Sequence, residues 1–432
     1  MRDGVGRHSV RHVGDLVICL MFRGCGINLI GLLLTALVGA CSTAPRAAAP
    51  PNHFSGPVAP VGFPATVRSL DVDRGFYLAH SEETRERLRR AAGDGPVNIL
   101  ALSGGGAGGS FGAGALIGLT QRGERPPFAV VTGVSTGALL APFAYLGSGW
   151  DAELREVFVS GQAEHLLRTR GIGVLFGPGL YQSGPLIELV HHIVTNEMIT
   201  AIAQESAKGR SLLVVTTDLD KEETVIWDMG AIASQGGEAA RRLFCEVLVA
   251  SASIPGVFPP VVIHVEGSGR SYDEMHVDGG TTVPFFFMPE IAELLPNSGD
   301  HLKDANLYVI IDSQFSTLPQ TTPEKTIPIL ARSFTAELGH SSRVTLALVA
   351  AYAQRHGMNF RFTDIPVDYP YKGSLDFHRE TMQALFDYAL GCAAQGQLWT
   401  TPDQALASSE RALSAAPGHT VQCPGPDSAS SP

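Results

Sequence analysis

The sequence of 432 residues has few of the features that nucleic-acid and metal sites require. It carries 31 Lys and Arg against 42 Asp and Glu, for a formal net charge of -11, and no basic stripe stands out from this average. Because binding to phosphate backbones depends on a basic surface, nucleic acid is not expected as a partner. The six cysteines show no CxxC or Cys/His spacing, so neither a metal nor another cofactor is predicted.

The amino-terminal apolar stretch, residues 27–40, is too short to span a bilayer core, which needs about 20 apolar residues. Four arginines precede it and it ends in small residues, which is the layout of a secretory signal. A signal peptide over residues 1–40 is therefore predicted, with a retained transmembrane helix as the weaker alternative. A leader counted from Met21 has a more ordinary length, so translation is expected to start there.

The leader ends in Leu37-Val38-Gly39-Ala40-Cys41, which resembles the lipobox of bacterial lipoproteins. In those proteins the cysteine is diacylated and becomes the first residue, so Cys41 would hold the chain at a membrane surface. Ser42 at the next position, rather than Asp, resembles lipoproteins sent to the outer membrane. A cell-envelope location facing the periplasm or exterior is expected; an ordinary leader with a chance cysteine is the alternative.

The rest of the chain, after the leader, is expected to form four segments. Residues 41–66 are rich in Ala and Pro and predict a flexible tether. A catalytic domain is expected over residues 67–313, followed by a helical carboxy-terminal extension over 314–423 and a disordered tail over 424–432. In an oxidising compartment Cys392 and Cys423 can pair across this extension, but three unpaired thiols are an equally good interpretation.

Strand and helix patterns alternate along the middle of the chain, which predicts an α/β fold with a mostly parallel sheet covered on both faces. The expected strands are residues 97–102, 128–132, 211–217, 224–227 and 307–311, with a possible edge strand at 359–363. The expected helices are residues 81–92, 136–146, 186–207, 238–250, 326–355 and 374–395.

Gly133-Val134-Ser135-Thr136-Gly137 matches the G-x-S-x-G nucleophile elbow. The expected strand before it and helix after it are the context that this motif requires. Small residues are needed on both sides because the serine occupies a sharp, strained turn. Alone the motif is common, and a serine that merely caps the helix is the alternative.

A glycine loop, Ser103 to Gly109, leaves the first buried strand and enters an apolar helix-like segment. Such a loop directs several backbone N–H groups at one point, where they can bind phosphate or an oxyanion. As a dinucleotide site it lacks a suitably placed acidic residue, because Glu124 lies in a polar turn. Beside Ser135 the oxyanion interpretation is favoured, since a nucleophile and preorganised donors are complementary parts of acyl transfer.

The base that would activate Ser135 is less obvious. Asp278 precedes Gly279 and Gly280, which let a short carboxylate approach another loop closely. A carboxylate must be desolvated or aligned on the hydroxyl to act as a base. The alternative is a triad with a histidine, but the candidates lie in or beside helical stretches: His340, His356 and His378.

Four segments in this order resemble the patatin-like phospholipases. They are residues 103–109, 133–137, 250–260 (Ala-Ser-Ala-Ser-Ile-Pro-Gly-Val-Phe-Pro-Pro) and 278–280. The resemblance covers residues 97–290, and more weakly 307–313. It implies a three-layer α/β/α fold and a lipolytic serine esterase that cleaves acyl esters of phospholipids or other lipids, although the family also includes acyltransferases.

The resemblance further implies a Ser-Asp dyad, with Ser135 as nucleophile and Asp278 as base. The glycines that shape these motifs are Gly133, Gly137, Gly279 and Gly280. The expected oxyanion donors are the amides of Gly104, Gly105, Gly106, Ala107, Gly108 and Gly109. Many members carry a basic residue where Gly108 stands, so esterase chemistry is better supported than a phospholipid headgroup. A catalytically silent envelope lipoprotein with this fold is the alternative function.

Replacing Cys41 tests the lipoprotein interpretation. Cys41→Ser should move the protein from the membrane fraction to the soluble fraction, because the acyl chains can no longer be attached. Globomycin should block maturation of the wild type, and Cys25→Ser, within the leader, should leave fractionation unchanged. If neither globomycin nor Cys41→Ser alters fractionation, the chain is not anchored through this cysteine.

Overall fold

The computed structural model describes residues 46–47, 58–70, 74–169, 171, 178–267, 269–287, 302–315, 321–414 and 421–426. The chain divides into two compact units, residues 1–48 and 49–432, and the fold below is that of the second. The predicted signal peptide, Cys41 and most of the predicted tether lie outside the described residues.

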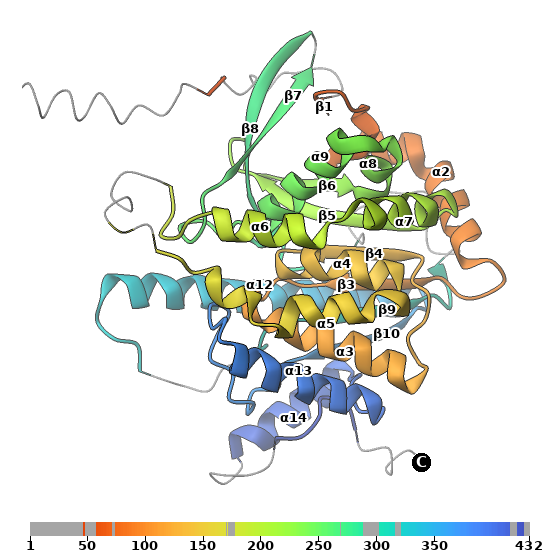
Figure 1. The fold of residues 1–432 in the computed structure, drawn as a ribbon. Helices are drawn as coiled ribbons and strands as arrows, with labels where there is room; N and C mark the ends of the chain where they lie inside the picture. The colour runs from red at the N-terminus through yellow and green to blue at the C-terminus, as the bar shows by residue number, and fades with distance from the viewer. Residues whose placement is uncertain are drawn as a thin grey trace, which may run out of the picture. The chain divides into compact units, whose positions relative to one another are not determined.

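One mixed sheet forms the centre of the second unit (Figure 1). Its parallel half has the order β5-β4-β3-β9-β10: Ser211–Asp218, Val130–Val134, Asn98–Leu102, Asn306–Ile311 and Asn359–Asp364. The antiparallel strands continue from β5 through β8 (Arg270–Asp278), β7 (Val261–Gly267) and β1 (Ala59–Pro60). β6 (Glu223–Asp228) also pairs with β5 and carries β2 (Arg68–Leu70). The parallel part is therefore one half of the sheet rather than most of it.

Alternating side chains of the buried strands divide the core between two helical layers. Leu100 and Leu102 of β3 belong to the apolar cluster shared with α3 and α4, whereas Ile99 and Ala101 belong to the cluster that contains Leu346 of α12. Successive residues of a strand point to opposite faces, so a continuous apolar strand needs cover on both sides. The expected three-layer α/β/α architecture is confirmed.

The helices of the first face are α3 (Gly109–Arg122), α4 (Thr136–Leu146), α5 (Asp151–Val159), α6 (Gly184–Ile193), α7 (Asn196–Ala207), α9 (Gly237–Ser251) and α13 (Arg379–Ala394). α12 (Thr326–Arg355) covers the other face. The described part of this unit also contains α2 (Arg74–Ala92), α8 (Met229–Gln235) and α14 (Pro402–Ser414). None of the described helices combines the length and apolar character that a bilayer span requires.

Three expected helices differ from the observed ones. The helix predicted over 81–92 begins earlier, at Arg74. The helix predicted over 186–207 is two helices, because Val194 leaves helical geometry and Thr195 caps α7 by accepting a hydrogen bond from Met198 N at 3.1 Å. The helix predicted from 374 begins at Arg379, and the residues before it form a loop. Hydrophobic spacing does not distinguish one long helix from two that share a buried face.

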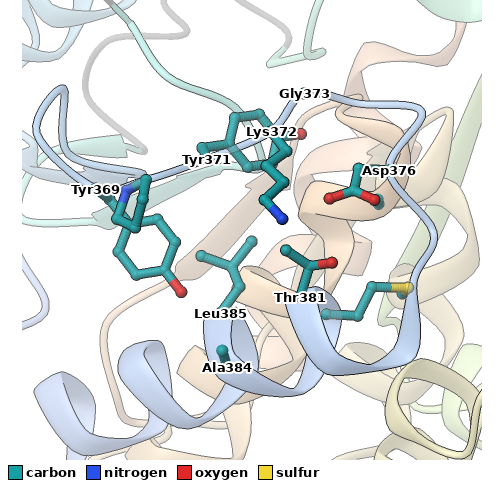
Figure 2. Close-up of a pocket in the computed structure, with 11 residues that line it drawn as sticks. Tyr369, Tyr371, Lys372, Gly373, Asp376, Thr381, Ala384 and Leu385 are labelled. Carbon is teal, nitrogen blue, oxygen red and sulfur yellow. The ribbon is translucent and has the colours of Figure 1, made fainter.

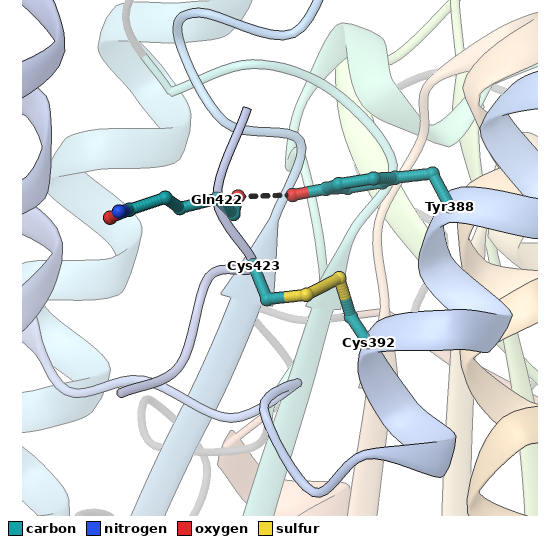
Figure 3. The surroundings of a disulfide bond; sticks show 4 residues. All are labelled: Tyr388, Cys392, Gln422 and Cys423. Carbon is teal, nitrogen blue, oxygen red and sulfur yellow. Dashed lines mark hydrogen bonds between the residues drawn. A yellow bond between two sulfur atoms is a disulfide. The ribbon is translucent and has the colours of Figure 1, made fainter. Parts of the chain in front are cut away.

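The carboxy-terminal segment is built into the sheet and the first helical layer. β10 pairs in parallel with β9, and α13 packs on α3. A disulfide joins Cys392 and Cys423 across 31 residues, and Tyr388 OH donates to Gln422 O at 2.6 Å beside it (Figure 3). The pairing that the sequence left open is thus formed.

The first residues of the predicted disordered tail are held by the fold. Pro424 is buried, and Gly425 N donates to Gln397 O at 2.7 Å. An ideal Cβ on Gly425 would lie 2.6 Å from Trp399 O, so this glycine passes close to another backbone segment. Order thus extends at least two residues past Cys423, because the neighbouring disulfide and these contacts restrain the chain.

Glycines of α3 allow its close approach to α13. An ideal Cβ on Gly118 would lie 2.5 Å from Leu390 O, and one on Gly114 would lie still closer to Phe386 O. Gly114→Ala should therefore lower the free energy of unfolding by about 1–3 kcal/mol, measured by chemical denaturation.

Gly391 in the interior of α13 provides the matched control. An ideal Cβ there has open space, so Gly391→Ala should be neutral or stabilise by roughly 0.5–1 kcal/mol through helix propensity. Equal destabilisation by both substitutions would contradict close packing of α3 on α13.

Candidate active site

Ser135 occupies the sharp turn between β4 and α4. Its backbone has φ 56° and ψ −123°, a region that residues with a side chain rarely adopt. The flanking glycines are required by close contacts, since an ideal Cβ on Gly137 would lie 2.5 Å from Leu102 O and one on Gly133 would collide with α4. The turn projects the Ser135 side chain out of the strand direction, as the elbow motif predicts.

Asp278 meets Ser135 at the carboxyl edge of the sheet. Ser135 Oγ donates to Asp278 Oδ2 at 2.5 Å, and Gly280 N donates to Oδ1 at 2.7 Å. Asp278 is the last residue of β8 and lies opposite Thr216 of β5, the strand beside β4. Both side chains are buried, and an ideal Cβ on Gly279 would lie 2.5 Å from Val215 O, so no larger residue fits after the aspartate.

Burial changes the acidity of Asp278. Loss of solvent raises the pKa of Asp278 to about 7, although the hydrogen bonds from Ser135 and Gly280 act in the opposite direction. Desolvation disfavours the charged form of a carboxyl group. The carboxylate is therefore a stronger proton acceptor than a solvated aspartate and still ionises near neutral pH.

Three hydroxyl-bearing residues hold this pair in place, and sequence reasoning did not assign them a role. Ser251 Oγ accepts from Ser135 N at 3.0 Å and donates to Val215 O at 2.7 Å. Asp278 N donates to Ser253 O at 2.9 Å, and Thr217 Oγ1 donates to Asp278 O at 3.1 Å. Ser251 and Ser253 belong to the segment 250–260. The resemblance of that segment to patatin-like proteins was the only sequence signal that could have pointed to their role.

The glycine loop lies directly beside Ser135, since an ideal Cβ on Gly104 would be 3.0 Å from Ser135 Cβ. Four of the six expected oxyanion amides are occupied by protein acceptors. Gly104 N donates to Pro284 O, Ala107 N to Ser374 O, Gly108 N to Gly105 O, and Gly109 N to Gly106 O and Ala107 O. The amides of Gly105 and Gly106 have no acceptor within the described part of the chain, so these two can receive an oxyanion.

The place of Gly108 explains why no basic side chain is present there. An ideal Cβ on Gly108 would lie 3.0 Å from Tyr371 OH and even closer to the carbonyl of Asp312. Asp312 is fully buried at the end of β9, where its Oδ1 accepts from Gly112 N at 2.9 Å. A larger residue at position 108 therefore does not fit this loop.

Residues 100–288 match the family model described as patatin-like phospholipase. This match indicates a patatin-like domain in that part of the chain. It supports a lipolytic hydrolase in general terms and implies a lipid substrate. The structure also resembles VipD from Legionella pneumophila, at 13% identity and a TM-score of 0.32, covering 74% of this chain and 71% of that chain. A comparison with curated proteins found no match.

No histidine bonds to Ser135 among the described residues of the patatin-like domain and its extension. His378 Nδ1 contacts Asp376 Oδ1 at 2.5 Å on the surface, and the ring of His356 stacks on Tyr352 with centroids 4.2 Å apart. His340 is exposed on α12. The described part also contains no group of three His, Cys, Asp or Glu side chains that could hold a metal.

The raised pKa of Asp278 predicts a pH-dependent stability. Between the ordinary pKa of 3.8 and the folded value of about 7, the folded state binds more protons than the unfolded chain, so its stability falls as pH rises. Asp278→Asn lacks this ionisation. The free energy of unfolding of the variant minus that of the wild type should therefore increase from pH 5 to pH 7 and level off above it.

The control is Asp94→Asn, because Asp94 is exposed in the folded domain. Its stability difference from the wild type should stay constant over the same pH range. A constant difference for Asp278→Asn as well would show that the folded domain does not hold this carboxyl in its neutral form.

Proposed function

We propose that this protein is a serine acyl hydrolase that cleaves an ester of a phospholipid or another lipid through a Ser135-Asp278 dyad. The observation that carries the proposal is the 2.5 Å hydrogen bond from Ser135 Oγ to the buried carboxylate of Asp278. In the first step Asp278 takes the hydroxyl proton while Ser135 Oγ bonds to the ester carbonyl carbon. The carbonyl oxygen becomes an oxyanion.

The tetrahedral intermediate then collapses and the alcohol leaves, taking the proton that Asp278 holds. Water attacks the acyl-enzyme, Asp278 accepts a proton from that water, and the fatty acid leaves with Ser135 restored. One group thus acts as base and as acid in each half of the reaction. A carboxyl group with a pKa of about 7 suits both roles at neutral pH.

The oxyanion is assigned to the amides of Gly105 and Gly106, which are free of protein acceptors in the described part. The loop leads into α3, whose positive amino-terminal end adds to the field at this point. Donors fixed in advance in a buried site stabilise developing charge without reorganisation. The two amides are therefore placed to act chiefly in the transition state.

We also propose that Cys41 is lipidated and anchors the protein in the cell envelope, with the outer membrane favoured and the domain facing the periplasm or exterior. The lipobox-like sequence before Cys41 supports the anchor. The disulfide between Cys392 and Cys423 supports an oxidising compartment, because cytosolic thiols are kept reduced. Such an anchor would hold the domain near its lipid substrates.

Substitution of the dyad tests the catalytic role. Ser135→Ala and Asp278→Asn should each lower kcat for a short-chain aryl ester by roughly 10⁴-fold or more, as for residues that act as one unit. A fluorophosphonate probe should label the wild type but not Ser135→Ala. Vesicles of several phospholipid classes, assayed for released fatty acid, would then identify the headgroup.

Substitution of the histidines separates the alternatives. His340→Ala, His356→Ala and His378→Ala should keep the wild-type kcat, whereas loss of turnover in one of them would indicate a histidine triad. Normal turnover in Asp278→Asn would show that another group is the base. A wild type that neither turns over esters nor reacts with the probe would indicate a silent lipoprotein that retains the fold.

A further inference from the structure

The orientation of the two free glycine amides is controlled from their carbonyl sides. In a trans peptide the C=O and the following N–H point in opposite directions, so a group that holds the carbonyl also directs the amide. The Gly105 amide shares its peptide with the Gly104 carbonyl, and the Gly106 amide shares its peptide with the Gly105 carbonyl. Each of these two carbonyls accepts a hydrogen bond from a side-chain hydroxyl.

Ser103 holds the first peptide. Its Oγ donates to Gly104 O at 2.8 Å and accepts from Asp312 N at 2.9 Å. The second of these bonds fixes the orientation of the Ser103 hydroxyl. The Asp312 amide binds a lone pair of Oγ, so the hydroxyl proton is directed at Gly104 O. Ser103 is almost fully buried at the end of β3, so water does not compete for this carbonyl.

Tyr371 holds the second peptide. Its hydroxyl donates to Gly105 O at 3.1 Å, and Gly108 N donates to the same oxygen at 3.0 Å. Burial raises the pKa of Tyr371, so the phenol keeps its proton and remains a donor. The Gly105 carbonyl is thus held by Tyr371 OH and Gly108 N. The Gly106 amide of the same peptide therefore points away from Tyr371.

Tyr371 comes from residues 369–376, which we call the strap, in the part of the chain beyond the family match. The strap passes over the first turns of α13 and borders a cavity of about 170 Å³ lined in part by Tyr371, Lys372 and Ala107 (Figure 2). Ser374 O of the strap accepts from Ala107 N at 2.8 Å. The strap is thus bound to the glycine loop at two points.

Contacts on the amino-terminal side fix the strap itself. Gln314 Nε2 donates to Pro366 O at 2.7 Å and to Tyr369 O at 3.0 Å. Tyr371 N donates to Tyr369 O at 2.6 Å, so the backbone turns tightly just before the phenol. The Tyr371 hydroxyl is therefore held by the fold and does not depend on bound substrate for its position.

We propose that Ser103 and Tyr371 are positioning residues that orient and polarise the Gly105 and Gly106 amides toward the oxyanion. The inference rests on the proposed serine hydrolase function and deepens it. A hydrogen bond accepted by a carbonyl strengthens the N–H of the same peptide as a donor. Both hydroxyls therefore act through the peptide bond, without contact with the substrate.

Tyr371→Phe is the direct test, because it removes only the hydroxyl. It should lower kcat for an aryl ester by on the order of 10-fold, less than the roughly 10²–10³-fold for loss of a whole donor, and leave KM unchanged. Affinity for an alkyl trifluoromethyl ketone, which forms a tetrahedral oxyanion on the serine, should fall by the same factor. A direct Gly105→Ala change is a poorer probe, since its Cβ would collide with Asp312 O.

Tyr369→Phe is the matched control in the same strap. Its ring packs on Tyr388 with centroids 4.8 Å apart, and within the described part of the chain its hydroxyl makes no hydrogen bond to the glycine loop. It should keep wild-type kcat, KM and ketone affinity. Ser103→Ala is the second variant and should repeat the Tyr371→Phe pattern; equal melting temperatures would separate positioning from loss of fold.

The outcomes separate this inference from the function on which it rests. If Ser135→Ala is inactive but Tyr371→Phe and Ser103→Ala keep wild-type kcat and ketone affinity, positioning is wrong and the dyad stands. A rise in KM alone would also refute it, because the hydroxyl would then contribute to substrate binding in the ground state and not to stabilising the transition state. If Ser135→Ala retains full turnover, both proposals fall.

Discussion

The hydrogen bond between Ser135 and Asp278 depends on a change of strand direction within one sheet. β4 and β5 are parallel, and β8 then pairs antiparallel with β5. β8 pairs only through its last residues with the end of β5, so its earlier residues lie past the carboxyl end of β5. The β7-β8 hairpin projects from the rest of this unit (Figure 1). The last residue of β8, Asp278, consequently lies at the edge where β4 ends, and its side chain contacts that of Ser135 in a buried position.

Close backbone packing is the second constraint on the site. Gly137 and Gly279 approach carbonyl oxygens of neighbouring strands so closely that a Cβ would collide with them, and Gly105 and Gly108 do the same at Asp312. These glycines let three turns converge on a volume that excludes water. That exclusion raises the pKa of Asp278 and would strengthen the interaction of free amides with a developing charge.

The carboxy-terminal segment completes the surroundings of the glycine loop. β10 extends the sheet beside β9, α13 packs on the glycines of α3, and the strap between them contacts Gly105 and Ala107. The disulfide from Cys392 to Cys423 closes this segment onto α13. The carboxy-terminal extension lies outside the family match, but its residues pack against the loop that carries the candidate oxyanion donors.

The sequence by itself determined the α/β class, the elbow, the glycine loop and the aspartate, because each is a local pattern of small residues and apolar strands. It did not determine that half of the sheet is antiparallel, or that 186–207 is two helices, since spacing along the chain does not report strand direction or a break between helices that share a face. Only the tertiary structure decided which amides stay free, the pairing of Cys392 with Cys423, and the contacts of Ser251 and Tyr371. Those outcomes depend on partners far away in the chain, and a lone serine or tyrosine carries no local signal of the backbone group that folding brings to it.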